Sequence, residues 1–171
     1  TLHRVEYSPV QTLQPVYIAQ DMLMYEQQSG FVCPEHARAR LLEYAREFDA
    51  APQVLCHRDL LLENILIISE GTDIHVQLID FEYAGFTHPL WDVASFILEA
   101  DMSMDQRAEF AMAYGLPPDV IATALARMEI VVDYVWGLWG LVNGYGEYGK
   151  NRLHRAFTRL SLAHEPRCTA H

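Results

Sequence analysis

The stretch of this sequence that decides its fold is residues 56–66, Cys-His-Arg-Asp-Leu-Leu-Leu-Glu-Asn-Ile-Leu. It joins a polar cluster at 57–59 to three consecutive leucines and a second polar pair, Glu63 and Asn64, before the chain turns apolar again. A buried strand has no use for so many polar groups, and a surface turn has no use for so many leucines. The pattern therefore predicts a loop that its leucines anchor to the core while its polar tips face a ligand.

The polar positions follow the spacing H-x-D-x-x-x-x-N, from His57 through Asp59 to Asn64. A carboxylate at Asp59 can accept a proton from a hydroxyl nucleophile, and the carboxamide oxygen of Asn64 can bind Mg²⁺. Further along, Leu-Ile-Asp-Phe-Glu-Tyr-Ala-Gly at 78–85 puts Asp80 at the end of an apolar run, where it can be a second oxygen ligand. A base, an amide and a second carboxylate in this order indicate phosphoryl transfer. The competing interpretation is structural, with His57 and Asp59 satisfying loop amides and Asp80 capping a turn.

Composition limits the class of protein. The 171 residues are 51% hydrophobic and 20% charged, which is typical of one globular domain. The formal net charge of −11 argues against nucleic-acid binding, which needs a basic surface. Three cysteines without metal-like spacing, Cys33, Cys56 and Cys168, indicate free thiols in a reducing cytoplasm. The first ten residues do not resemble a signal peptide, and the most apolar segment, 130–146, is shorter than the roughly 20 residues that cross a bilayer. We expect a soluble cytoplasmic protein and leave its oligomeric state open.

The hydrophobic periodicity predicts a mainly helical α+β fold with a small strand insert that carries the polar motifs. A short strand is expected at 53–57, and two apolar runs around Glu-Gly-Thr-Asp at 70–73 predict a hairpin. Ser103 and Gln106 form a predicted capping box. Helices are expected over residues 16–28, 34–50, 90–100, 103–115, 117–142 and 145–162.

The motif order also defines a resemblance. H-R-D-x-x-x-x-N alone is the catalytic loop of protein kinases, but Asp80-Phe81-Glu82 replaces their D-F-G and no A-P-E follows. With Ile-Asp-Phe-Glu-Tyr at 79–83 and Trp91-Asp92 opening a helix, the chain resembles the choline/ethanolamine kinase branch of the aminoglycoside phosphotransferase superfamily over about 54–157. The resemblance implies the large C-terminal lobe of a protein kinase-like fold. Its expected parts are leading helices at 1–53, catalytic and metal-binding loops at 54–86, substrate-binding helices at 87–163 and a tail at 164–171.

Aromatic residues near the C-terminus indicate the substrate. Trp136 and Trp139 lie three residues apart, hence on one face of a helix, and four glycines at 137, 140, 144 and 146 indicate that something approaches the backbone closely. Aromatic faces attract a quaternary ammonium by cation–π interaction, although such a stripe can also simply pack into the core. The resemblance assigns a choline pocket to Glu99, Trp136, Trp139, Tyr145 and Tyr148.

Three residues are expected to support the site. Besides the structural role of His57, we expect Asp92 to hydrogen-bond backbone amides of the 57–59 loop. For Glu82 two roles stay open: orienting a metal-bound water or pairing with Arg58. Three further histidines, His75, His88 and His154, show no ligand spacing and are expected at the surface.

The predicted function is transfer of the γ-phosphate of ATP to choline, giving phosphocholine, with Asp59 as base and Asn64 and Asp80 holding Mg²⁺. The alternatives are another amino alcohol (ethanolamine, thiamine or an aminoglycoside), or a non-catalytic module that binds choline or a partner protein. No Gly-rich loop with a strand lysine precedes Val54, Lys150 is the only lysine, and the sequence does not begin with methionine. We therefore expect a large lobe without its small N-terminal lobe, inactive or poor at holding ATP by itself.

Overall fold

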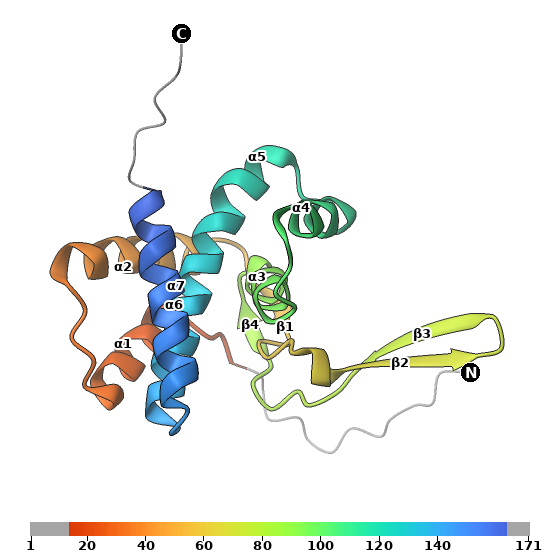
Figure 1. Ribbon diagram of the computed structural model, residues 1–171, viewed down its shortest axis with the longest axis horizontal. Coiled ribbons are helices and arrows are strands. Elements are labelled where there is room, and N and C mark those ends of the chain that lie inside the picture. The colour runs from red at the N-terminus through yellow and green to blue at the C-terminus, as the bar shows by residue number, and fades with distance from the viewer. Residues whose placement is uncertain (1–13, 164–171) are drawn as a thin grey trace, which may run out of the picture.

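The structure is a computed structural model that describes residues 14–163 of the chain. Cys168, the first thirteen residues and the predicted tail lie outside the described residues. The helices gather into one body, and a long two-stranded hairpin projects from it (Figure 1). The helices are α1 (Ile18–Ser29), α2 (Glu35–Asp49), α3 (Leu90–Glu99), α4 (Met104–Ala113), α5 (Pro118–Val120), α6 (Ala126–Val142) and α7 (Gly146–Leu162).

Two small antiparallel sheets hold the polar motifs. The projecting hairpin pairs β2 (Ile65–Glu70) with β3 (Asp73–Leu78), and the second sheet pairs β1 (Val54–Cys56) with β4 (Gly85–Thr87). The hairpin and β1 confirm the sequence prediction, but β4 lies where only a loop was expected. Because β1 leads into the 57–64 loop and β4 follows the 80–84 segment, their pairing brings the two halves of the motif together.

Local sequence signals account for most helix boundaries. Gly30 ends α1 in the left-handed conformation, with φ 65°. Ser103 and Gln106 form the predicted capping box at the start of α4. The helix expected over 117–142 is helical throughout, but it contains one π-helical turn, Ile121–Leu125, that the hydrophobic pattern did not indicate.

Helix α6 forms the centre of the core. It packs against α1, α2, α3 and α7, and nearly every residue from Met128 to Val135 is buried. A helix that is buried on nearly all faces is stable only when other elements surround it, and the acidic residues within it, Glu129 and Asp133, pair with arginines. None of the helices within residues 14–163 has the length and apolar character that a bilayer span requires.

Three glycines let α7 lie against the backbone of α6. A Cβ added at Gly149 would stand 2.6 Å from the carbonyl oxygen of Gly137, and one added at Gly140 would stand 3.0 Å from the Gly149 Cα. The close approach that the glycine pattern predicted is therefore present at Gly137 and Gly140, and the approaching group is a helix rather than a ligand. Because the two helices approach closely, Tyr148, next to Gly149, lies close to the Trp136–Trp139 stretch of α6.

Gly149→Ala is expected to destabilise the fold by about 1–3 kcal/mol, because the new methyl group meets backbone atoms that cannot rotate away. The matched control is Gly146→Ala at the start of the same helix, where an added Cβ meets no atom within 4 Å. Urea denaturation of the two variants measures the difference. Equal free energies of unfolding would show that the helices tolerate wider separation.

Candidate active site

Asp92, at the start of α3, holds the 57–64 loop. Its carboxylate accepts the backbone N–H of His57 at 2.7 Å and that of Arg58 at 2.8 Å, which confirms the expected hydrogen bonds at two positions of the loop. The neighbouring Trp91 indole N–H donates to the carbonyl of Arg58 at 3.2 Å. These contacts hold Arg58 in the left-handed region, with φ 67°, a conformation that a non-glycine residue keeps only when its surroundings stabilise it.

The Arg58 side chain ties the same loop to α1. Its guanidinium pairs with the Asp21 carboxylate and lies over the Trp91 ring, 5.2 Å from the ring centroid. The alternative in which Glu82 pairs with Arg58 is therefore not the arrangement found. Glu82 instead lines a pocket described below.

His57 joins the two motif segments. A carbonyl oxygen can only accept, so the imidazole Nε2 donates to the carbonyl of Ile79, at 2.8 Å. The Nδ1 atom then accepts the backbone N–H of Asp59 at 3.3 Å, and the ring packs on Phe81 with 4.5 Å between centroids. One buried imidazole thus connects the residue before Asp80 to Asp59.

Asp59 and Asn64 contact each other directly. The Asn64 amide nitrogen donates to the Asp59 carbonyl at 2.9 Å and to its carboxylate Oδ2 at 3.2 Å. Burial raises the pKa of the Asp59 carboxyl above its ordinary value, and the hydrogen bond from Asn64 acts in the opposite direction. A raised pKa suits a group that must take up a proton during a reaction.

The residues predicted to bind metal fit Mg²⁺ by their chemistry. The Asn64 nitrogen faces Asp59, which leaves its amide oxygen as the atom for a cation. Asp80 has φ 62° and is exposed, and its charge raises the pKa of Asp59, so the two carboxylates lie within electrostatic reach of each other. Two oxygen ligands are enough for Mg²⁺, which fills its shell with water and phosphate. Residues 14–163 hold no cluster of three or more His, Cys, Asp or Glu side chains suited to a metal.

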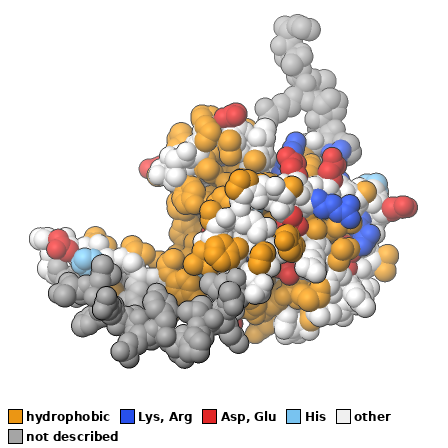
Figure 2. Space-filling view, turned by 180° about the vertical axis from the view of Figure 1, so that it is seen from behind, with side chains coloured by type: hydrophobic (Ala, Val, Ile, Leu, Met, Phe, Trp, Pro, Cys, Tyr) orange, Lys and Arg blue, Asp and Glu red, His pale blue; other side chains and the backbone are white. Residues whose placement is uncertain are grey.

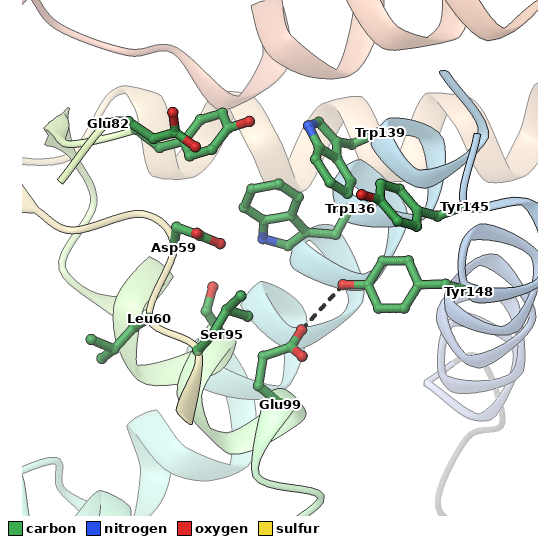
Figure 3. Close-up of a pocket in the computed structure, with 11 residues that line it drawn as sticks. Asp59, Leu60, Glu82, Ser95, Glu99, Trp136, Trp139, Tyr145 and Tyr148 are labelled. Atoms are coloured by element: carbon green, nitrogen blue, oxygen red, sulfur yellow. Dashed lines mark hydrogen bonds between the residues drawn. The ribbon is translucent and has the colours of Figure 1, made fainter. Parts of the chain in front are cut away.

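A pocket of about 270 Å³ lies beside Asp59. Figure 3 shows the acidic side chains of Asp59, Glu82 and Glu99 around it and the aromatic rings on the opposite side. Its walls come from the catalytic loop, the 82–83 segment, α3, α6 and the residues around the start of α7. The lining residues are Asp59, Leu60, Leu61, Glu82, Tyr83, Ser95, Glu99, Trp136, Trp139, Tyr145 and Tyr148.

The aromatic rings form a connected wall. Trp136 and Trp139 meet edge to face with 5.3 Å between centroids, and Tyr145 stacks on Trp139 at 5.5 Å with an interplanar angle of 8°. Tyr83, which the sequence analysis did not single out, meets Trp136 edge to face at 5.9 Å. Both tryptophans are partly buried and line the pocket, and Trp136 also packs against the hydrophobic core, so the stripe does more than fill the core.

Glu99 lines the pocket as predicted, but it already has partners. The Tyr148 hydroxyl donates to its carboxylate at 3.3 Å, and Arg152 of α7 forms an ion pair with it (Figure 3 shows the tyrosine contact). Arg152 also lies over the Tyr148 ring, 4.9 Å from the centroid. A cationic ligand would therefore meet a carboxylate whose charge is shared with a buried arginine.

Seven of the predicted residues thus lie in one pocket. The other four lie beside it: His57, Asn64 and Asp80 in the loops, and Asp92 at the start of α3. Sequence reasoning missed Ser95 and Arg152, because neither belongs to a motif, and it gave no role to Tyr83, the last residue of the 79–83 motif. It was also wrong about His88, which is half-buried against Phe48 and whose pKa is lowered by burial, whereas His75 and His154 are exposed as expected.

Comparisons with known proteins agree with this geometry. Residues 13–129 match the family model described as the phosphotransferase enzyme family. Ethanolamine kinase 2 of Rattus norvegicus is 38% identical over 148 residues, which is 74% of this chain and 38% of that protein. Protein LicA of Haemophilus influenzae is 31% identical over 119 residues, 61% of this chain and 43% of that protein. The chain thus spans less than half the length of these curated relatives.

The solved structures show the same fold. Choline kinase LicA from Streptococcus pneumoniae superposes with a TM-score of 0.70 at 25% identity, covering 86% of this chain and 56% of that one. The kinase-like fold expected from the motifs is confirmed. Since the family model spans more than half of the chain, this chain belongs to the phosphotransferase enzyme family, with relatives named choline and ethanolamine kinases.

Proposed function

We propose that this chain carries the base and the acceptor pocket of an enzyme that transfers the γ-phosphate of ATP to the hydroxyl of choline, giving phosphocholine. The observation that carries the proposal is the shared pocket, in which Asp59 and five aromatic residues line the same space. Aromatic faces hold a trimethylammonium group by cation–π attraction, worth roughly 0.5–2 kcal/mol per ring. The hydroxyl, two carbons from the nitrogen, then reaches the carboxylate.

The reaction assigns one role to each polar group. The choline oxygen attacks the γ-phosphorus, the bond from that phosphorus to the bridging oxygen breaks, and ADP leaves. Asp59 accepts the hydroxyl proton, while His57 and Asp92 keep the loop fixed through their backbone contacts. Asn64 and Asp80 would hold Mg²⁺, which neutralises phosphate charge when bound. Glu82, which lines the pocket, would orient a water bound to that metal, the alternative that remains for it.

Two observations support ATP as the phosphate donor: a relative that binds a nucleotide and an exposed apolar surface on this chain. A solved structure of LicA holds AMP. In this chain, hydrophobic side chains lie exposed on the hairpin and the segments at its base, where Figure 2 shows them gathered between hairpin and helical body. We infer that a small N-terminal lobe covers this surface and completes the ATP site. The exposed residues include Leu62, Ile67, Ile74, Val76 and Phe81.

Ethanolamine is the second candidate, because the similarity to ethanolamine kinase 2 favours it, whereas the pairing of Glu99 with Arg152 counts against it. A primary ammonium donates hydrogen bonds to carboxylates, whereas a trimethylammonium needs the aromatic wall that this pocket has. Thiamine and aminoglycosides have no specific observation in their favour here.

The experiment is an assay of phosphate transfer from Mg·ATP with the full product of the gene that encodes this chain. Choline, ethanolamine, thiamine and kanamycin are supplied separately and in competition. The proposal expects choline to have the largest kcat/KM. A larger value for ethanolamine would support the second candidate, and choline binding without turnover of any acceptor would support a non-catalytic module.

A further inference from the structure

Ser95 is a buried polar residue on the wall of the pocket that no motif includes. Its residue is 2% exposed, and its hydroxyl Oγ has no hydrogen-bond partner among residues 14–163. Figure 3 shows the side chain among the pocket residues, between Asp59 and Glu99. Buried hydroxyls nearly always have a partner, so an orphaned one on a residue that lines a cavity indicates that a ligand supplies it.

The orphan state is unusual for a serine in a helix. Such a hydroxyl normally donates to the carbonyl four residues earlier, which here belongs to Trp91. That bond is absent from the hydrogen bonds of Ser95, although α3 is regular at this point. The hydroxyl is therefore free to turn into the pocket.

The position of Ser95 along α3 indicates which end of a bound ligand its side chain would contact. Asp92 is three residues earlier on the same helix face and holds the amides just before Asp59, while Glu99 is four residues later and bonds Tyr148. One turn of helix rises about 5.4 Å. Ser95 thus lies toward the Asp59 end of the pocket, and Glu99 and Tyr148 mark the end that holds the cation.

We propose that Ser95 donates a hydrogen bond from its Oγ to the reacting hydroxyl oxygen of the acceptor, while Asp59 accepts the proton of that hydroxyl. The inference rests on the proposed function and adds a second contact to the same oxygen. An alcohol oxygen has two lone pairs, so one accepts from Ser95 and the other stays directed at the phosphorus. Two fixed contacts orient the nucleophile, which speeds a reaction that depends on positioning.

The contact is independent of the head group. Choline and ethanolamine share the hydroxyl and differ only at the nitrogen, which lies beyond Ser95 toward the aromatic wall. Ser95 therefore acts equally on both acceptors and has no contact with a cation that lacks a hydroxyl.

The test compares Ser95→Ala with wild type in the full gene product, using choline, ethanolamine and ethyltrimethylammonium, which is choline without its hydroxyl. The loss of one hydrogen bond is expected to lower kcat/KM about 3- to 10-fold for both acceptors. The inhibition constant of ethyltrimethylammonium should change less than about 2-fold, because its contacts are unaltered. Thr87→Val is the matched control: Thr87 is 0% exposed and its hydroxyl is also unpartnered, but it does not line the pocket. Its kinetics should equal those of wild type.

Each other outcome contradicts the inference in its own way. An unchanged kcat/KM in Ser95→Ala would show that Ser95 makes no such contact. A loss of kcat/KM together with a rise in the inhibition constant of ethyltrimethylammonium would indicate a distorted pocket instead. An equal loss in Thr87→Val would show that any buried hydroxyl on this side of the fold matters. A wild-type enzyme that phosphorylates neither acceptor would overturn the proposed function itself, and the role of Ser95 with it.

Discussion

Asp59→Asn is expected to lower kcat for phosphate transfer by about 10²- to 10⁴-fold, because a carboxamide cannot take up the hydroxyl proton. The substitution keeps the shape of the side chain and removes its negative charge. His57 and Asp92 bind the backbone of the loop rather than the Asp59 carboxylate, so the fold should survive. Choline affinity should change little, since the cation lies at the aromatic wall. Steady-state kinetics with Mg·ATP and choline separate the two effects.

The control is Asp105→Asn, which removes the same charge from an exposed position in α4. Its kcat should equal that of wild type. If Asp59→Asn kept more than about a tenth of wild-type kcat, a side chain other than Asp59 would have to take the proton.

Asp133→Asn is expected to lower the free energy of unfolding by about 3–5 kcal/mol, because it removes the buried carboxylate that pairs with Arg152, Arg155 and Arg159. Asp133 is 0% exposed and accepts hydrogen bonds from Arg152 at 3.1 Å, Arg155 at 2.7 Å and Arg159. Burial, together with the charges of Arg155 and Arg159, lowers the pKa of Arg152 to about 9. Asp133 is the carboxylate that all three arginines share, although Arg152 also pairs with Glu99.

Urea denaturation measures this loss. The control is Asp73→Asn on the exposed hairpin, which should change stability by less than about 0.5 kcal/mol. Since Arg152 also pairs with Glu99, the Asp133 variant should in addition bind choline more weakly. A loss of stability equal to that of the control would mean that the arginines are well solvated without Asp133.

Short-range patterns predicted a large part of this structure. The capping box of α4, the glycine end of α1 and the hairpin depend on residues a few positions apart, and their geometry is set locally. The catalytic loop was predictable for the same reason, since the spacing from His57 to Asn64 fixes which polar groups share one loop. The expected bond from Asp92 required the family resemblance as well.

Pairings between distant elements were not predictable. Arg58 with Asp21 and Arg152 with Glu99 each join elements whose relative position depends on how the helices pack. The strand β4 was missed because three residues, Gly85–Thr87, are too few to show a period. The glycines of α6 predicted that another group approaches its backbone closely, but only the packed structure shows that Gly149 of α7 is that group.

The affinity of the pocket for choline, compared with that for its uncharged analogue 3,3-dimethylbutan-1-ol, tests the central claim most directly. The two molecules have nearly the same shape and share the hydroxyl, so only the positive charge differs. Isothermal titration calorimetry on the full gene product should give choline a dissociation constant at least about 10-fold lower, because several aromatic faces attract the charge. Equal affinities for the two molecules would contradict the account, since the aromatic wall would then be an apolar surface with no preference for a cation.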